Sequence, residues 1–337
     1  MNQNRTEREN YTIPKGKVLI FGDIHLTNKD IGRHKNYEKE SLETITRIEK
    51  IVREEKPVAI FFLGDLIGYR DTVLQHGDFF TKVLNFFIGL NKATNGRVFT
   101  VKGNHDIAPR TDFDTLEGID LIKVPNYVDC ENVRYHFVNY GEEYEPLDIP
   151  EDNNITNVVL GHNFYLPDTY YDGYGGKGEP ILVPELKNMA GIKMIITGHI
   201  HGCMDDTATT ILDGKEVFVY YTGSFSRSAS NDKHETSTYI RFEYLDNSDR
   251  VSYTIEPVQL TPLEEILIPK EKILDAETAD KIKEETIKEV VEVLAQRKVC
   301  VLDFKEQIDK LPAGLFSDEA MEYTKNVLAH QVNKDEA

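Results

Sequence analysis

The sequence predicts an α/β protein in which two mixed β-sheets pack together, flanked by helices, with an α-rich C-terminal tail. Three observations lead to this prediction. The first part of the 337-residue chain alternates short apolar runs with segments of helical periodicity. The middle part is a succession of strand-like runs with hairpin turns, and the last part is charged and helical in periodicity. Hydrophobic residues make up 40% of the chain, so a full core can be buried.

The first 101 residues follow the order strand, helix, strand, helix, strand. Apolar runs at 17–21, 58–63 and 97–101 predict buried strands, and a glycine closely follows each run. Between them, 36–55 and 78–94 carry apolar residues at helical spacing. The short connections between these elements favour parallel βαβ units.

The middle of the chain is richer in strands. Strands are predicted at 133–139, 157–160 and 193–197. Two hairpins follow, one turning at Asp213-Gly214 and the other across 246–249. This succession predicts a second, more antiparallel sheet that packs on the first.

The chain divides into three predicted parts. Residues 1–15 form a flexible lead, residues 16–257 form the α/β domain, and residues 258–337 form an acidic helical region. Within the last part, 278–296 places apolar side chains on one face of a helix rich in Glu and Lys. This face either docks a partner or packs on the chain's own domain.

Composition and charge exclude several classes of protein. The chain has 39 Lys and Arg against 58 Asp and Glu, and its formal net charge of −19 excludes a uniformly basic DNA-binding surface but not a local cationic patch. It has no apolar run of about 18 residues, and its polar start is neither a signal peptide nor a transit peptide. Cys130, Cys203 and Cys300 lie far apart, which predicts no disulfide framework. We therefore expect a soluble, cytoplasmic protein without membrane contact.

Five predicted strands end in a glycine that precedes polar residues able to bind a metal. These motifs are Gly22-Asp23-Ile24-His25, Gly64-Asp65, Gly103-Asn104-His105-Asp106, Gly161-His162 and Gly198-His199-Ile200-His201. Each motif alone is commonly a turn, a cap or a packed histidine. Because the carboxyl ends of strands in an open α/β sheet face one crevice, the five loops can converge. Together they predict one common site, in which Asp106 either orients a histidine or caps the next segment.

The donors at this predicted site suit two metal ions. They comprise two Asp, one Asn and four His, apart from the additional His105. A single tetrahedral zinc site takes only about four ligands. Two metals that share a bridging carboxylate would use the whole set. Mixed imidazole and oxygen ligation favours Mn²⁺, Fe²⁺ or Zn²⁺.

The series of motifs resembles the calcineurin-like metallophosphoesterase superfamily, from about residue 18 to 202 and onward to 257. The resemblance implies that superfamily's sandwich fold and a dimetal phosphodiester hydrolase. It assigns the ligands as follows: Asp23, His25 and His201 to the first metal, Asp65 as the bridge, and Asn104, His162 and His199 to the second metal. His105 would be the catalytic histidine that contacts the phosphate. A metal-bridging hydroxide would attack phosphorus while the cations neutralise the developing charge.

Within this superfamily, the chain resembles SbcD-type DNA-repair exonuclease subunits, including small phage recombination nuclease subunits. The shared features are the chain length, the spacing from Asp65 to Asn104, the last histidine motif and the acidic helical tail. The resemblance implies a manganese-dependent DNA exonuclease or endonuclease of repair or recombination. It also implies a coiled-coil SbcC-type ATPase as partner, and a homodimer is the other assembly expected.

Three further residues are predicted to contact the substrate. The segment 220–227, Tyr-Tyr-Thr-Gly-Ser-Phe-Ser-Arg, is similar to one in these nucleases, which implies that Ser224 and Arg227 lie near a phosphate. The alternative is an ordinary strand and turn. Lys177 lies in the Tyr- and Gly-rich loop 170–178, which either stacks on bases or covers the surface. The loop cations that could form a patch for DNA are Lys29, Arg33, Lys35, Arg70, Arg110, Lys177 and Arg227.

Two positions depart from the nuclease pattern. Gly68 stands three positions past Asp65, where these nucleases commonly carry a polar residue that supports the catalytic histidine, and Thr27 stands where glycine is usual. Two other functions therefore stay open. One is a nucleotide or cyclic-nucleotide phosphodiesterase, or a phosphoprotein phosphatase, of the same superfamily. The other is a non-catalytic scaffold, against which the complete ligand set argues.

Overall fold

The structure of the chain is a computed structural model. It describes residues 8–28, 37–68, 78–107, 112–142, 154–167, 181–186, 191–202, 208–212, 214–227, 234–244 and 251–266. The chain divides into two compact units, Met1–Ile268 and Pro269–Ala337, and the described residues belong to the first. The predicted helix at 278–296 and the predicted turn at 246–249 lie outside the described residues. None of the helices in the described part of the chain has the length and apolarity needed to cross a membrane.

The first strands and helices form the predicted parallel βαβ units. Strands β2 (Val18–Phe21), β3 (Ala59–Phe62) and β4 (Val98–Thr100) pair in parallel. Helix α1 (Tyr37–Glu55) connects β2 to β3, and α2 (Asp78–Thr94) connects β3 to β4. All residues of these three strands are buried, as expected for strands covered on both faces. These predictions are confirmed, with ends that differ by at most one residue.

Two strands from late in the unit complete this sheet. β13 (Thr236–Tyr244) and β14 (Val251–Gln259) form an antiparallel hairpin, and β13 pairs antiparallel with β2. The order of the five-stranded sheet is therefore β14-β13-β2-β3-β4. The prediction that this hairpin belongs to the second sheet is wrong. An alternating pattern identifies a strand, but it does not identify the distant strand with which it pairs.

The second sheet has seven strands in the order β1-β5-β6-β7-β10-β12-β11. They are β1 (Tyr11–Thr12), β5 (Tyr127–Cys130), β6 (Val133–Val138), β7 (Thr156–Gly161), β10 (Ile192–Thr197), β11 (Ala208–Leu212) and β12 (Lys215–Tyr221). Its central strands β6, β7, β10 and β12 are parallel, so the sheet is mixed and not more antiparallel than the first. β1 lies within the predicted flexible lead, and it pairs with β5.

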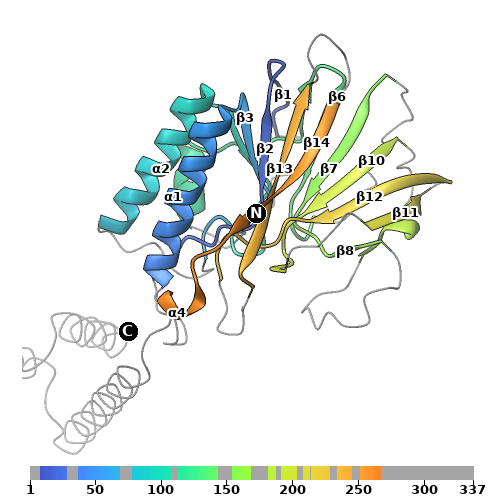
Figure 1. Cartoon of the computed structure of the whole chain (residues 1–337). Helices are drawn as coiled ribbons and strands as arrows, with labels where there is room; N and C mark the ends of the chain where they lie inside the picture. Colours follow the sequence, from blue (N-terminus) through green and yellow to red (C-terminus); the bar gives the residue numbers. More distant parts are fainter. Residues whose placement is uncertain are drawn as a thin grey trace, which may run out of the picture. The chain divides into compact units, whose positions relative to one another are not determined.

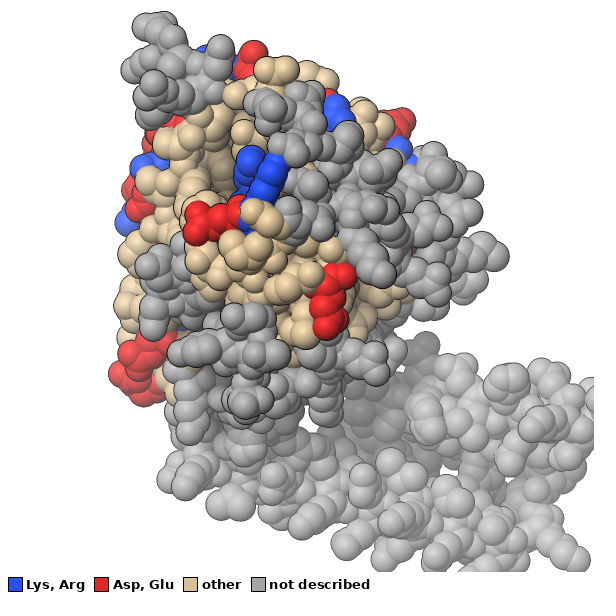
Figure 2. Space-filling model, turned by 90° about the vertical axis from the view of Figure 1, so that its right-hand side faces the viewer, with Lys and Arg blue, Asp and Glu red and all other residues tan. Residues whose placement is uncertain are grey.

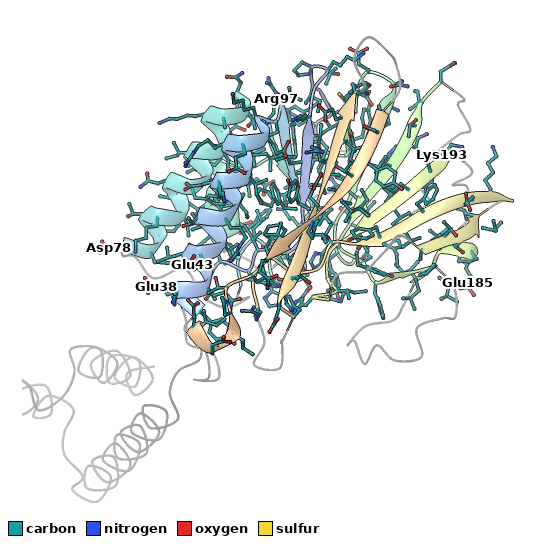
Figure 3. All side chains as sticks on the ribbon, in the orientation of Figure 1. Glu38, Glu43, Asp78, Arg97, Glu185 and Lys193 are labelled. Carbon is teal, nitrogen blue, oxygen red and sulfur yellow. The ribbon has the colours of Figure 1, made fainter. Side chains whose placement is uncertain are left out.

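The two mixed sheets form a sandwich, which confirms the predicted fold class. Aromatic side chains fill the space between the sheets, where Phe61 packs against Tyr135 and Phe137 at ring-centroid distances of 5.0 and 5.2 Å. Helices α1 and α2 cover the outer face of the five-stranded sheet (Figure 1). Charged side chains such as Glu43 on α1 and Lys193 on β10 lie at the outer surface (Figure 3).

Short elements complete the unit. β8 (Tyr165–Leu166), β9 (Ile181–Leu182) and the 3₁₀ helix η2 (Val183–Glu185) pack on the outer face of the seven-stranded sheet. Helix α3 (Asp112–Gly118) follows β4, and α4 (Leu263–Ile266) follows β14.

Candidate metal centre

The loops that follow β2, β3, β4, β7 and β10 carry the seven predicted metal ligands and His105, and they meet at one place. The decisive contact joins the two sheets: Asp65 Oδ2, after β3, lies 3.2 Å from His162 Nε2, after β7. The Nδ1 atom of His162 donates a hydrogen bond to the carbonyl of Leu63 at 2.6 Å, which leaves Nε2 to face Asp65. Strand ends from both sheets therefore build a single site.

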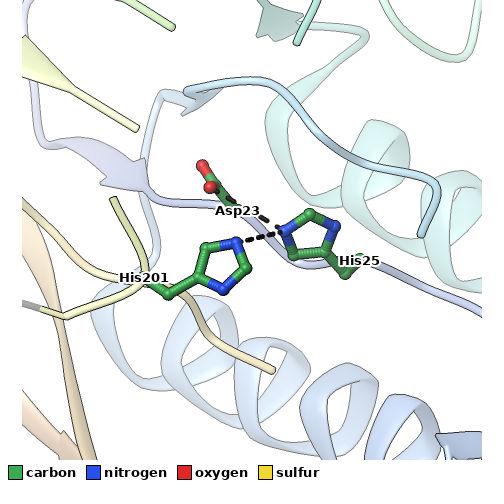
Figure 4. Close-up of side chains that lie close together, drawn as sticks. All are labelled: Asp23, His25 and His201. Atoms are coloured by element: carbon green, nitrogen blue, oxygen red, sulfur yellow. Dashed lines mark hydrogen bonds and ion pairs between the residues drawn. The ribbon is translucent and has the colours of Figure 1, made fainter. Parts of the chain in front are cut away.

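Asp23, His25 and His201 form the first group of donors. The Nε2 atoms of His25 and His201 are 3.2 Å apart, and His25 Nε2 is 3.8 Å from Asp23 Oδ2. Figure 4 shows the three side chains turned toward one another. One donor atom from each lies within 4.8 Å of the others, close enough to hold one metal ion.

Asn104, His162 and His199 form the second group. Asn104 Oδ1 lies 3.1 Å from His162 Nε2 and 3.0 Å from His199 Nδ1. Asp65 Oδ2 stands between the two groups, because it is 3.2 Å from His162 Nε2 and 3.8 Å from His25 Nε2. This is the position that a bridging carboxylate requires.

Glycines in two of the motifs make room for carboxylates of other motifs. A Cβ atom on Gly103 would lie 2.1 Å from Asp65 Oδ1, and one on Gly198 would lie 2.3 Å from Asp23 Oδ1. Any other residue at these positions would displace a predicted ligand. The glycines at the strand ends therefore follow from the packing of the site itself.

Three of the predicted ligands have left-handed backbone conformations, with φ of 41° at His25, 47° at Asp65 and 73° at His199. Non-glycine residues pay for such conformations, which persist where the surrounding structure fixes them and which gather at functional sites. Here the strand ends fix them in loops that turn the side chains inward.

The charges within the site are mutually dependent because its groups are buried. Burial raises the pKa of Asp23 to about 7 and lowers the pKa of His25 well below its usual value. Burial also opposes the charged form of His162, but Asp65 and Asp23 outweigh this effect and raise its pKa to about 10. Burial lowers the pKa of His199 to about 4. In the absence of a cation, His162 therefore supplies positive charge to the two carboxylates.

His105 differs from the predicted ligands in its exposure. Its side chain is 27% exposed, whereas the side chains of His25 and His162 are fully buried. Its backbone N–H donates to Asp65 Oδ1 at 2.8 Å, and its Nε2 lies 4.0 Å from Asp65 Oδ2. Nδ1 lies 3.0 Å from the carbonyl oxygen of Gly68, which orients the ring. The supporting group expected three positions past Asp65 is thus a backbone carbonyl.

Asp106 connects two of the loops. Its buried carboxylate accepts a hydrogen bond from the N–H of Gly103 at 2.9 Å and from those of Leu66 and Ile67 at 3.4 Å each. These bonds run back toward the loops after β3 and β4, not forward to a following helix. Asp106 thereby holds the Asp65 loop and the Asn104 loop together.

The predicted substrate contacts Arg227 and Ser224 are bonded to other groups of the protein. Arg227 is fully buried, and its guanidinium binds Glu40 and the carbonyl oxygens of His234 and Thr261. Ser224 is also fully buried and donates to the carbonyl of Asp23. This geometry favours the structural alternative for both residues. An arginine with a partner 187 positions away cannot be recognised from local sequence.

Six of the seven residues of the predicted cationic patch lie outside the described residues. Lys177 and its loop at 170–178 lie outside the described residues, as do Lys29, Arg33, Lys35, Arg70 and Arg110. The face shown in Figure 2 carries isolated basic side chains among the described residues, beside acidic ones.

Tyr140 is a neighbour of the site that the sequence did not indicate. Its half-buried ring lies 5.4 Å from the ring of His199 and 6.1 Å from that of His162, between centroids. It follows β6, which pairs in parallel with β7. Its place after a strand that runs beside β7 is the one signal that could have found it.

Comparison with known proteins agrees with this geometry. The family model of the calcineurin-like phosphoesterases matches residues 16–203. The chain therefore belongs to the calcineurin-like phosphoesterase family. No curated protein sequence matches the chain.

One solved structure that the chain matches is a "Putative 5'-Nucleotidase from Staphylococcus aureus in complex with alpha-ketoglutarate". It is 15% identical, with a TM-score of 0.40, and the match covers 78% of this chain and 58% of that one. The chain thus spans less than two thirds of that protein's length.

The described residues fit the dimetal centre that this family uses. Two carboxylates, one amide oxygen and four imidazoles converge at the site, and both carboxylates are buried. A buried carboxylate whose pKa is raised, as at Asp23, favours a nearby cation, because the cation restores the ionised form. Mixed nitrogen and oxygen donors are suited to first-row transition metals.

Proposed function

We propose that this metal-dependent phosphoesterase is a DNA nuclease of SbcD type that hydrolyses phosphodiesters in repair or recombination. The proposal assigns Asp23, His25 and His201 to one metal, the second group to the other, and Asp65 to both. We propose manganese as both metal ions.

One observation carries the proposal: the partly exposed His105 stands beside the buried Asp65, at the centre of the predicted ligands. A phosphate held at the metals would therefore lie next to His105, which can contact both it and solvent. A scaffold has no need of seven converging donors with a partly exposed histidine beside them.

The proposed chemistry divides between the cations and the chain. When bound, two cations activate a water molecule and neutralise charge on the phosphate. Because the Gly68 carbonyl engages Nδ1, His105 presents Nε2 to the substrate. From there a protonated Nε2 can stabilise charge on a phosphate oxygen or protonate the leaving oxygen. Asp65 fixes the backbone of His105 through the 2.8 Å hydrogen bond, so the ligand and the catalytic group keep their spacing.

The partners are proposed on the resemblance and on charge. A chain with a net charge of −19 needs additional cationic contacts to hold DNA firmly. An SbcC-type coiled-coil ATPase would supply them, and the region after residue 258 is the proposed docking segment. A homodimer is the alternative source of a second DNA-binding surface.

The test is a manganese-dependent assay on end-labelled linear duplex DNA, run in parallel with a small aryl phosphodiester. We expect cleavage of both substrates by the wild-type protein. His105→Ala should lower DNA cleavage by about 10²–10⁴-fold, as expected for loss of a general acid, and retain its manganese. Cleavage of DNA by His105→Ala at the wild-type rate would contradict the assigned role.

A phosphoesterase that acts on nucleotides, cyclic nucleotides or phosphoproteins is the second candidate, and the position of Arg227 favours it. Of the seven cations predicted to bind DNA, Arg227 is the one that the structure describes, and it is buried. Hydrolysis of nucleotides, cyclic nucleotides or phosphoproteins without cleavage of DNA would establish this second function.

A further inference from the structure

The segment that follows β12 lies against the loop that carries Asp23. The carbonyl oxygen of Asp23 accepts two hydrogen bonds from this segment, one from Ser224 Oγ at 3.0 Å and one from the N–H of Phe225 at 2.7 Å. The next carbonyl, that of Ile24, accepts a hydrogen bond from Ser226 Oγ at 2.8 Å. The backbone between the predicted ligands Asp23 and His25 is therefore fixed by three residues from more than 190 positions away.

The same segment also holds the loop that carries His201. The N–H of Ser224 donates to the carbonyl of His201 at 2.9 Å. Asp23 follows a strand of the five-stranded sheet, and His201 follows a strand of the seven-stranded sheet. Ser224 thus ties together the two loops, one from each sheet, that must meet at the first metal.

Helix α1 holds this segment in place from the other side. Glu40 Oε1 accepts a hydrogen bond from the backbone N–H of Arg227 at 3.1 Å and pairs with its guanidinium at 3.2 Å. Both side chains are buried. Thr44, one turn further along α1, donates from Oγ1 to the carbonyl of Phe225 at 3.0 Å. Phe225 and Arg227 are therefore attached to α1.

We infer that the buried pair of Glu40 and Arg227, together with Ser224 and Ser226, positions the first metal's ligands without touching the metal. None of these four side chains belongs to the first group of donors. Ser224 and Ser226 hold the backbone of Asp23 and Ile24, next to His25, whose φ of 41° needs external support. The pair of Glu40 and Arg227 anchors their segment. The inference rests on the two-metal site proposed above. It adds that these four residues support the ligands of the first metal and not those of the second.

The test compares the same substitution at two places on one helix. Glu40→Gln removes the charge that anchors Arg227. Glu55→Gln, at the far end of α1, removes the charge that pairs with Lys17 and Arg241 at 3.1 and 2.9 Å. The two positions lie about 22 Å apart along the helix axis, so the control variant leaves the metal loops untouched. Ser226→Ala is a milder second variant, because it deletes one hydrogen bond to Ile24.

The readout is Mn²⁺ binding to the full chain by titration calorimetry. The wild type should bind two ions. In Glu40→Gln and Ser226→Ala, one of the two ions should bind about tenfold more weakly, a typical cost of losing an outer partner of a metal site. Glu55→Gln should bind both ions as the wild type does.

Combination with ligand variants identifies the affected ion. In an Asn104→Ala background, which weakens the second site, Glu40→Gln should weaken the remaining ion. In a His201→Ala background, it should have no further effect.

The outcomes separate this inference from the proposed function. If the wild type binds two ions and both test variants retain wild-type affinity for each, the positioning role is wrong and the metal site stands. If Glu40→Gln and Glu55→Gln weaken both ions equally, the effect is general destabilisation and the inference also fails. If the wild type binds fewer than two ions, the proposed two-metal site fails first.

Discussion

Gly68 packs directly against Thr27. A Cβ atom added to Gly68 would lie 3.1 Å from Cβ of Thr27 and 2.9 Å from the carbonyl oxygen of His25. The N–H of Gly68 donates to the carbonyl of Leu26 at 3.1 Å, and an isolated parallel β-bridge between Leu26 and Ile67 joins the two loops. The two departures from the nuclease pattern are therefore one structural feature: the threonine fills the space that a side chain at position 68 would need.

Gly68→Ala should destabilise the protein because the added methyl group meets Thr27 and the His25 backbone. Overpacking of this kind costs about 1–3 kcal/mol in the free energy of unfolding, which urea denaturation measures. Thr27→Gly in the same chain should recover part of this loss, since it vacates the space on one side. An unchanged free energy of unfolding for Gly68→Ala would show that the loops separate easily.

Asp106→Ala should loosen the contact between the Asp65 and Asn104 loops. The substitution leaves the N–H of Gly103 without its carboxylate partner, and an unsatisfied buried donor costs about 1–3 kcal/mol. We expect a lower midpoint in urea and weaker Mn²⁺ binding by calorimetry. Asp114→Ala, at an exposed position on α3, is the matched control and should change neither quantity. Equal effects of the two variants would contradict the connecting role of Asp106.

Metal binding should weaken as the pH falls. In the metal-free protein, Asp65 and Asp23 raise the pKa of His162 to about 10, so this histidine holds a proton at neutral pH. A metal ligand must be neutral, so the metal displaces that proton, and the apparent affinity rises with pH by up to about tenfold per unit for each proton released. Calorimetry in buffers of different ionisation enthalpy counts the protons.

Asn104→Ala serves as the control for this pH dependence, because Asn104 does not titrate. It should lower the affinity for the second ion, while the weakened binding of that ion should still strengthen as the pH rises. Affinity that does not change below pH 10 would contradict the assignment of His162 as a ligand.

A chain that ends at residue 268 should retain the fold of the first unit, and a chain that ends at residue 257 should not retain its stability. The shorter chain cuts β14 and loses Leu260 and Ile266, which are 2% and 0% exposed. Loss of a large buried side chain costs about 2–5 kcal/mol. Thermal unfolding of the two fragments measures the difference. Identical melting temperatures would show that residues 258–268 contribute nothing to the core.

Local sequence determined much of the fold. The runs that became β2, β3 and β4 are apolar and end near glycine, and the helices between them have strong periodicity, so both type and bounds were predictable. β1 was missed because it has only two residues, too few for a pattern. The pairing of β13 with β2 could not be predicted, because it depends on which strand edge remains open after the parallel strands have formed.

The candidate site was predictable to the extent that its chemistry is local. Each donor follows a strand end, and the fold brings these ends together, so the groups around Asp65 appear where the sequence placed them; their roles as metal ligands stay a prediction. Arg227 shows where this reasoning fails. An arginine after a Gly-Ser turn reads as a phosphate contact, yet its actual partner is Glu40, whose distance along the chain hides it.

The left-handed conformations at His25, Asp65 and His199 bear on protein engineering. Glycine adopts such backbone angles without strain. Replacing any of these three residues by glycine would therefore release conformational energy stored in the loops. Directed evolution for heat resistance alone, without a screen for catalysis, would therefore drift toward glycine at these positions and yield a hardier but inert protein.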